Sequence, residues 1–390
     1  MSSLKAFFRS NIRQNGMVIA LVFIMVLFQI LTGGILFVPM NITNLVLQNS
    51  YILILAIGML LCILTGNIDL SVGSVVAFVG AISAVLMVRL GLGVGITILI
   101  ALLVGVCAGM FHGAFIAYMR IPAFIVTLAG MLIFRGLTLV ILRGQTIGPF
   151  DGAFQALAAG YLPGREIEVL GHNLVAVVAG VVLSIYFVVS LWLGRRSRAH
   201  YGFDTLPLSI ELGRMAFIVI AINLLTLSLA RHNGIPIVLV LLLGLITLYT
   251  FVTRKTILGR HIYALGGNEK AARLSGVKTQ RTMFLVYTNM GLLSALAGIV
   301  VAGRLNAATP KAGTMFELDA IAAAFIGGAS ASGGIGTVIG AIVGGLVMGV
   351  LNNGMSIMGV SVDWQQAIKG LVLLAAVSFD VYTKNKAHRA

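Results

Sequence analysis

The residues best suited to contact a polar ligand are a few polar and ionisable side chains set in long apolar stretches of the chain. Carboxylate, imidazole, amide and hydroxyl groups donate or accept hydrogen bonds, which recognition of a polar solute requires. The same groups can hold a break in a helix, because they satisfy its free backbone amides. Seven positions are candidates for lining a passage or for holding such a break: Asn67, Asp69, Ser71, Ser74, His112, Thr127 and Asn306.

Structural and ligand-binding roles both stay open at these positions. Asn67 and Ser71 could cap the helix that follows Asp69, in which case Asp69 would pin the break and contact no ligand. His112 could hydrogen-bond a polar solute, but an interior histidine is more commonly satisfied by the protein itself.

No motif for covalent chemistry or for nucleotide, cofactor or metal binding accompanies these residues. The sequence has no Gly-Lys-Ser/Thr phosphate loop, no Cys-x-x-Cys, no His-Glu-x-x-His and no paired acids suited to hydrolysis. The spacing of Gly334, Gly336 and Gly340 does not match a dinucleotide-binding fingerprint. We therefore expect no catalytic residue, no cofactor and no metal, and any energy-requiring step must draw on an ion or on another subunit.

The composition places these residues in a membrane protein. Of the 390 residues, 59% are apolar and 9% are charged, whereas a soluble domain has about 25% charged residues. The mean hydropathy is +1.07. A folded surface in water cannot be covered by so few polar side chains, and a disordered chain would not be so apolar. Both classes are excluded.

Long runs without charge predict an all-α, polytopic integral membrane protein of about twelve crossings. A helix needs about 20 apolar residues to cross a bilayer, and shorter or broken helices are tolerated inside a bundle. The expected crossings are 16–38, 51–66, 72–88, 94–119, 123–142, 173–194, 215–230, 235–252, 283–303, 319–330, 335–351 and 364–380.

The basic residues test this count, because Lys and Arg in short loops collect on the cytoplasmic side. With the amino terminus inside, alternating crossings place eighteen of the 26 basic residues inside and six outside. The agreement requires two passes across 319–351, turning at 328–334. Both termini are then expected in the cytoplasm. The net charge of +15 is thus a topology signal and a means of attracting anionic lipid, and no nucleic-acid partner is expected.

Two stretches, within 51–142 and 283–380, share an order of unusual residues. Each has an acid before a short helix (Asp69, Asp319) and a basic residue before Gly-Leu (Arg135, Lys369). Such halves, inverted by the topology above, are a recurring transporter design. Chance similarity between glycine-rich segments is the alternative. Across the interface between the two halves, Arg135 and Lys369 are expected to pair with acids, of which Asp69 and Asp319 are the nearest by order of sequence. Gly336, Gly340 and Gly344 form a ladder for close helix packing.

The segment 253–282 is the largest cytoplasmic loop. Asn268 is a good helix cap, Glu269 suits the positive end of a helix, and Gly276 is a natural stop. Two turns of helix are not stable alone in water, so a helix from Asn268 to Ser275 is expected to dock on a partner. The alternative is a solvated connector.

This loop and three other segments, 66–74, 121–130 and 318–328, resemble the membrane permeases of bacterial ABC sugar importers. The likeness covers the chain from about residue 40 onward and is similar in detail to the xylose and multiple-monosaccharide types, whose inserted helix pair corresponds to 173–230. It implies one permease domain over 1–390 in the inner membrane. The substrate would be a monosaccharide such as xylose, arabinose, galactose or glucose.

The resemblance also implies partners: a second permease copy, two cytoplasmic ATP-binding subunits and a periplasmic sugar-binding protein. The loop 143–172 would face the binding protein, with Pro149, Asp151, Tyr161, Glu166 and Glu168. The residues implied to contact the ATPase are Gly259, Arg260, Gly267, Asn268, Glu269, Ala272, Arg273 and Gly276.

Other classes remain as alternatives. An ion-coupled secondary transporter of a small polar solute would also fit the inverted repeat and Asp69. A membrane enzyme is disfavoured because no catalytic cluster is present. Branched-chain amino acid permeases share the general architecture, but the segment 68–74 is more similar to the sugar branch.

Overall fold

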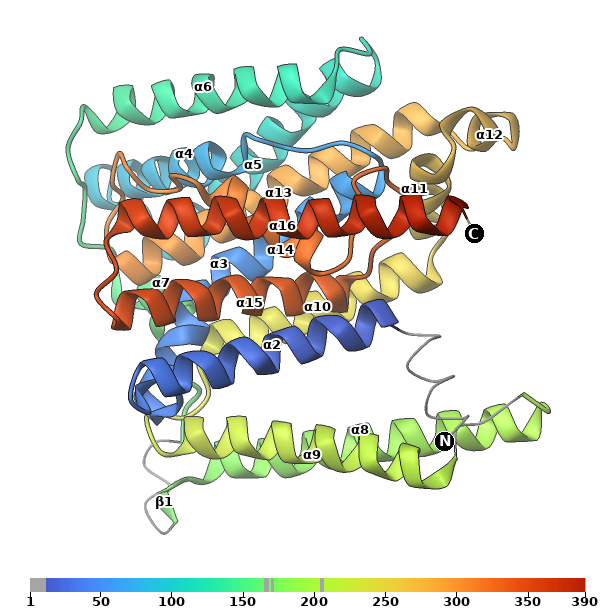
Figure 1. The fold of residues 1–390 in the computed structure, drawn as a ribbon. Coiled ribbons are helices and arrows are strands. Elements are labelled where there is room, and N and C mark those ends of the chain that lie inside the picture. Colours follow the sequence, from blue (N-terminus) through green and yellow to red (C-terminus); the bar gives the residue numbers. More distant parts are fainter. Residues whose placement is uncertain (1–11, 165–167, 170–171, 204–206, 390) are drawn as a thin grey trace.

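The computed structural model describes residues 12–164, 168–169, 172–203 and 207–389, with the side chains of 12–15, 168–169 and 379–389 left out. Nearly all of this is helical (Figure 1). The long apolar helices are α3 (Pro39–Leu64), α4 (Val72–Ala84) continuing into η2 (Val85–Arg89), α5 (Val94–Ala117), α6 (Ala123–Leu142), α8 (Leu174–His200), α9 (Leu208–Ala230), α10 (Ile237–Lys255), α13 (Thr279–Leu305) and α15 (Val338–Ile357).

Other elements complete the chain. They are α2 (Ile12–Leu31), η1 (Ile35–Phe37), α7 (Gly152–Ala159), α11 (Ile257–Gly267), α12 (Glu269–Leu274), α14 (Phe316–Ile326), α16 (Val362–Arg389) and the antiparallel pair β1 (Glu168–Val169) and β2 (His172–Asn173).

The all-α polytopic class is confirmed. Within the described ranges, nine helices are long and apolar enough to cross a membrane. The other three expected crossings correspond to α2, α14 and α16. With 11 residues, α14 is about half as long as a spanning helix. The number of crossings therefore stays a prediction.

Several predicted boundaries were wrong. Pro39 was expected to follow directly on the first crossing, which was placed at 16–38, but the first helix stops at Leu31 and Pro39 is the first residue of α3. Proline suits this position, because the first helical residue needs no amide hydrogen. The second crossing, expected at 51–66, therefore begins twelve residues earlier. Two helices, α7 and α11, were not expected at all.

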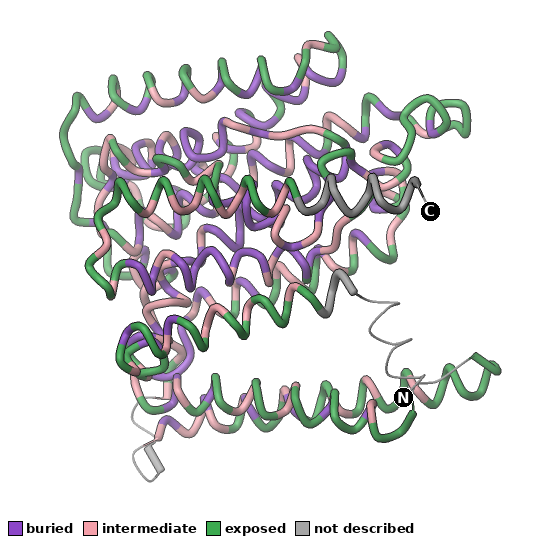
Figure 2. The backbone as a smooth tube through the Cα atoms, in the orientation of Figure 1, coloured by how far each residue is buried: buried purple, intermediate pink, exposed green. Residues whose placement is uncertain are grey.

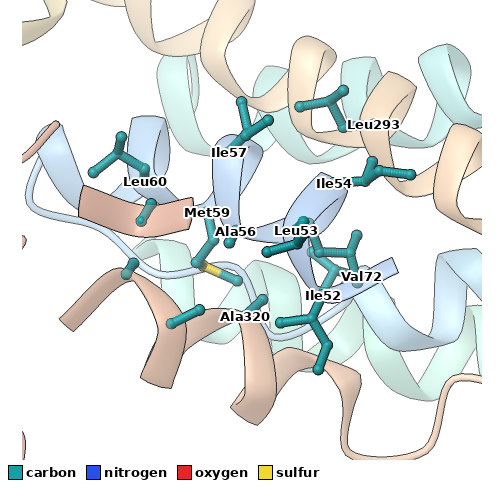
Figure 3. Close-up of a cluster of buried hydrophobic side chains, with 14 of the residues drawn as sticks. Ile52, Leu53, Ile54, Ala56, Ile57, Met59, Leu60, Val72, Leu293 and Ala320 are labelled. Carbon is teal, nitrogen blue, oxygen red and sulfur yellow. The ribbon is translucent and has the colours of Figure 1, made fainter. Parts of the chain in front are cut away.

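The core is built around α3, whose apolar residues occur on every face. Such a helix is stable only when it is surrounded by other helices. It packs against α13, α14 and α15, and 83% of its most apolar window is buried. In Figure 3, Ile52, Ile57 and Leu60 of α3 point in different directions toward neighbouring helices. Figure 2 shows the buried residues concentrated on these central helices.

Small residues bring the central helices close together. A Cβ atom at Gly105 or Gly109 of α5, or at Gly291 of α13, would overlap the backbone of the facing helix. Gly340 and Gly344 of α15 lie in the same way against the backbone of α14 and the turn after it, which confirms that part of the glycine ladder. Close approach through small residues drives helix association where lipid removes the hydrophobic effect.

The helices α8 and α9 form a hairpin at the edge of the molecule (Figure 1). The Asn223 side-chain amide of α9 donates a hydrogen bond of 2.8 Å to the Ser184 hydroxyl of α8. The Thr226 side chain packs against Gly180, where a Cβ atom would collide with it. Only 17% of the most apolar window of either helix is buried, so most of their surface faces outward. The carboxyl end of α8 and the amino end of α9 lie at the same end of the molecule as α12, the beginning of α2 and the end of α16 (Figure 1).

Candidate functional site

Asp69 organises the buried turn that connects α3 to α4. The side chain is 2% exposed, and its Oδ1 accepts hydrogen bonds from the Ser71 backbone amide at 2.8 Å and from the Ser71 hydroxyl at 2.6 Å. The expectation that Asn67 and Ser71 cap α4 was wrong. The hydroxyl of Ser71 is directed to the carboxylate, the stronger acceptor, and the Asn67 amide donates to the Thr65 carbonyl at 3.1 Å.

His112 of α5 extends this group. Its Nδ1 lies 3.4 Å from the Ser71 hydroxyl, so that Asp69, Ser71 and His112 form a continuous buried row. The ring is 1% exposed and its Nε2 faces Gly130 of α6, where a Cβ atom would collide with it. Phe134 packs edge-on against the imidazole, with ring centroids 5.7 Å apart. The contacts fix the imidazole in one orientation.

Thr127 and Ser74, the other candidates of this region, are buried but take no part in the row of Asp69, Ser71 and His112. Thr127 is fully buried, and its hydroxyl donates to the Ala123 carbonyl of its own helix at 2.9 Å. Ser74 lies in the first turn of α4, and its hydroxyl has no hydrogen-bond partner in the described part of the chain.

Two residues near Asp69 were not expected from the sequence. Cys62 of α3 and Tyr287 of α13 are both buried within electrostatic range of the Asp69 carboxylate. The sequence signal for Tyr287 was that it is a lone tyrosine in an apolar stretch, because the hydroxyl of a buried tyrosine usually lies near a polar partner.

Asn306 lies away from this group, at the far end of α13. It has a left-handed backbone (φ 54°) and ends the helix. Its Oδ1 accepts a hydrogen bond of 2.7 Å from the Phe150 amide. Asn306 therefore ties the loop before α7 to α13.

The first turn of α4 and the non-helical segment before α14 meet inside the molecule. A Cβ atom at Gly73 would overlap the Gly313 backbone, and the reverse is also true. Arg135 of α6 supports this contact, since its Nη1 donates to the carbonyls of Pro310 at 3.2 Å and Ala312 at 2.6 Å. The expected ion pair of Arg135 with Asp69 or Asp319 was wrong, because backbone carbonyls of the 310–315 segment satisfy the guanidinium.

Lys369 forms an ion pair with Asp319 of its own half, so the expected pairing across the interface between the two halves was wrong. Lys369 Nζ of α16 lies 2.9 Å from Asp319 Oδ1 of α14, and the Tyr51 hydroxyl of α3 donates to Oδ2 at 3.1 Å. The Tyr51 ring also stacks on Phe316, with centroids 3.7 Å apart. Three helices thus share one buried charge pair.

The segment 253–282 contains the expected short helix. Asn268 Oδ1 accepts from the Ala271 amide at 3.0 Å, α12 follows as far as Leu274, and Gly276 lies two residues beyond its end with φ 85°. The preceding α11 was missed, although Thr256 caps it by accepting from the Gly259 amide at 3.2 Å. Of the residues expected to contact the ATPase, Gly259 and Ala272 are buried. The exposed ones are Arg260, Gly267, Asn268, Glu269, Arg273 and Gly276.

Glycines join α11 to the end of α3 and to the turn between α14 and α15. A Cβ atom at Gly266 would overlap the Leu64 carbonyl, and the Gly334 amide donates to that same carbonyl at 2.9 Å. A Cβ atom at Gly333 would press on Gly266 and Gly66. We call Gly66, Gly266, Gly333 and Gly334 the glycine junction.

Tyr263 reinforces the glycine junction. Its hydroxyl donates to the Gly336 carbonyl at 2.7 Å. Burial raises the pKa of the Tyr263 phenol, while Arg254 acts in the opposite direction. The phenol therefore stays protonated and keeps its donor at neutral pH. A movement of α11 must reach both α3 and the 327–336 turn, because no flexible side chain separates them.

Sequence comparison assigns the chain to a known protein family. The family model described as the permease component of the branched-chain amino acid transport system matches residues 41–377. The chain belongs to this permease family. The permease is 38% identical to the xylose transport system permease protein of Escherichia coli (strain K12) over 97% of its own length and 94% of that protein.

Further relatives agree with this. The xylose transport system permease protein of Haemophilus influenzae is 39% identical, with 96% of the permease and 98% of the relative covered. The ribose import permease protein of Escherichia coli (strain K12) is 35% identical, with 87% and 85% covered. No solved structure gives a significant match. The relatives are permease components of transport systems, so the permease is a multi-pass membrane subunit and not an enzyme.

Proposed function

We propose that the permease is the transmembrane subunit of an inner-membrane ABC importer that translocates a monosaccharide, with a pentose such as xylose as the first candidate. The observation that carries this is the xylose relatives' match over 97% of the chain, against 87% for the ribose relative. The longer match favours the xylose type, in which an inserted helix pair equivalent to α8 and α9 is expected.

The drive would come from two copies of a separate ATP-binding subunit that dock on α12. Leu274, on the last turn of α12 beside Arg273, is 90% exposed, and a docked partner that buried its side chain would gain about 1.5–3 kcal/mol. Closure of the ATPase pair would pull α11 and α12, and the glycine junction would pass this movement to α3 and to the turn after α14.

We place the sugar passage between two copies of the permease. Asp69, Ser71, His112 and Thr127 are each 2% exposed or less, so they are enclosed within one chain in this conformation. They would shape the turn that lines or gates the passage and contact sugar only if the turn rearranges. A homodimer then supplies the passage that one chain does not enclose.

The packing supports the proposed inverted repeat of 51–142 and 283–380, with 173–230 as the insertion. The central α13 packs along α4 and α5, and the central α3 packs along α14 and α15. Each half thus inserts its first helix between elements of the other. Gly73, in the first turn of α4, also meets Gly313, which precedes α14, so the two halves touch here as well. Sites at such meeting points of broken helices are typical of transporters.

The opposite end would receive the periplasmic binding protein. Asp151 caps α7 there by accepting from the Ala153 amide at 2.8 Å, and Tyr161 forms a bridge with Pro236. Of the other residues expected in this loop, Glu166 lies outside the described residues and the side chain of Glu168 is not described.

The test is uptake of labelled sugars by proteoliposomes that contain the permease, its ATP-binding subunit and its binding protein. We expect ATP-dependent uptake of one or a few pentoses or hexoses. Uptake that persists without the ATP-binding subunit and follows an imposed ion gradient would favour a secondary transporter instead.

A further inference from the structure

A basic pocket lies between the ends of α8 and α9, far from the glycine junction. Its volume is about 230 Å³, and the residues that line it include Ser190, Arg195 and Arg198 of α8 and Glu211 and Arg214 of α9. The helices bring these residues together, because α9 runs back along α8 after the link at their ends (Figure 1).

The pocket has more positive than negative charge. Glu211 is 8% exposed and lies 3.7 Å from Arg195 Nη1. No ion pair or hydrogen bond joins Arg198 or Arg214 to another of the described side chains. Arg198 and Arg214 can therefore receive a further anion, since guanidinium groups bind phosphate oxygens in paired hydrogen bonds.

The surface next to the pocket is apolar and faces outward. Trp192 and Leu193 of α8 are 48% and 56% exposed, and Leu212 of α9 is 50% exposed. They lie within one or two turns of the pocket arginines. A tryptophan between a charged end and an apolar wall is typical of the membrane interface. A bound anion would therefore lie at headgroup depth, with apolar protein surface for its chains.

We propose that this pocket binds the phosphate headgroup of an anionic phospholipid in the leaflet that faces α12. Arg198 and Arg214 contact the phosphate, Arg195 holds Glu211, and the acyl chains run along Trp192 and Leu212. A free inorganic phosphate would satisfy the arginines but would make no use of the apolar wall. The lipid anchors the α8–α9 hairpin, which has few contacts with the rest of the bundle.

The experiment measures lipid retention by the full-length permease in detergent, using native mass spectrometry. The probe is phosphatidylglycerol, with phosphatidylcholine and inorganic phosphate as the other arms. Arg214→Gln removes one charge from the pocket. Arg196→Gln is the matched control, since Arg196 lies on the same end of α8 but lines a separate hollow with His200 and Tyr201.

We expect a retained phosphatidylglycerol whose affinity falls about fivefold in Arg214→Gln, the effect of one basic charge near an anionic headgroup, and further in Arg198→Gln/Arg214→Gln. Arg196→Gln should bind as the native chain does, and Arg214→Lys should be intermediate. A monodisperse gel-filtration profile identifies the folded variants. Equal loss in Arg214→Gln and Arg196→Gln would overturn the pocket, and displacement of the lipid by inorganic phosphate would overturn the lipid as its occupant.

Discussion

Lys369 Nζ lies 2.9 Å from Asp319 Oδ1, so α16 and α14 are joined by an ion pair in the interior of the permease. The Tyr51 hydroxyl donates to the other carboxylate oxygen, and Asp319 is 2% exposed. A charge at this depth is tolerated only when it is paired. The pair therefore ties the short α14 to both a central and a peripheral helix.

Breaking this pair should destabilise the permease. Lys369→Met leaves a buried carboxylate without its cation, which costs about 3–5 kcal/mol. We expect a lower melting temperature in detergent and less assembled protein. Lys369→Met/Asp319→Asn should recover much of the loss, because no charge is then left unpaired. Native stability in Lys369→Met would show that the pair does not hold α14.

Asp69 offers a test of shape against charge. Asp69→Asn keeps an oxygen that can accept from Ser71, whereas Asp69→Ala removes it and costs about 1–2 kcal/mol, as for a lost helix cap. Uptake should therefore fall less in Asp69→Asn than in Asp69→Ala. If both variants assemble normally and lose uptake equally, the charge of Asp69 itself takes part in transport.

The glycine junction should couple the ATPase to the passage. A Cβ atom at Gly266 would overlap the Leu64 carbonyl, whereas at Gly244 of α10 it would meet nothing within 4 Å. We expect Gly266→Ala to lower sugar uptake per ATP hydrolysed at least several-fold, because α11 is pushed from α3. Gly244→Ala should keep the native ratio. Similar ratios in the two variants would refute transmission through this contact.

Leu274 should anchor the ATP-binding subunit. Because its side chain is 90% exposed, Leu274→Asp leaves the permease fold intact and affects only what docks there. Losing the burial of a leucine side chain costs about 1.5–3 kcal/mol, so co-purification of the ATP-binding subunit should fall about tenfold or more. Ser275→Asp places a carboxylate on the next exposed residue and should have a much smaller effect. An unchanged complex in Leu274→Asp would place the docking surface elsewhere.

The sequence alone determined the features that depend on interactions between neighbouring residues, namely helices, their caps and their stops. Lipid requires every backbone group to be paired within a helix, so charge-free runs predicted the helices of the bundle. Asn268 and Gly276 predicted the bounds of α12 because a cap and a stop act on adjacent residues. Charges in apolar surroundings have few partners, so the sequence indicated that Lys369 pairs with an acid, but it placed that acid across the interface between the halves and not in the same half as Lys369. The motifs around Asp69 indicated the permease family.

Only the tertiary structure decided which residues meet. The row from Asp69 through Ser71 to His112 and the contact of Gly266 with Leu64 join segments that have no shared local signal. The carbonyl partners of Arg135 could not be predicted either. Every residue has a backbone carbonyl, so the sequence does not show which carbonyls a guanidinium contacts.

Hydropathy also did not separate the core from the surface. The α8 helix has the higher mean hydropathy, 2.7 against 2.1 for α3, yet 17% of its window is buried against 83% for α3. Lipid is as apolar as leucine, so an apolar side chain gains little by leaving it for protein. Close packing through small residues and buried polar contacts therefore decides which helix lies at the centre.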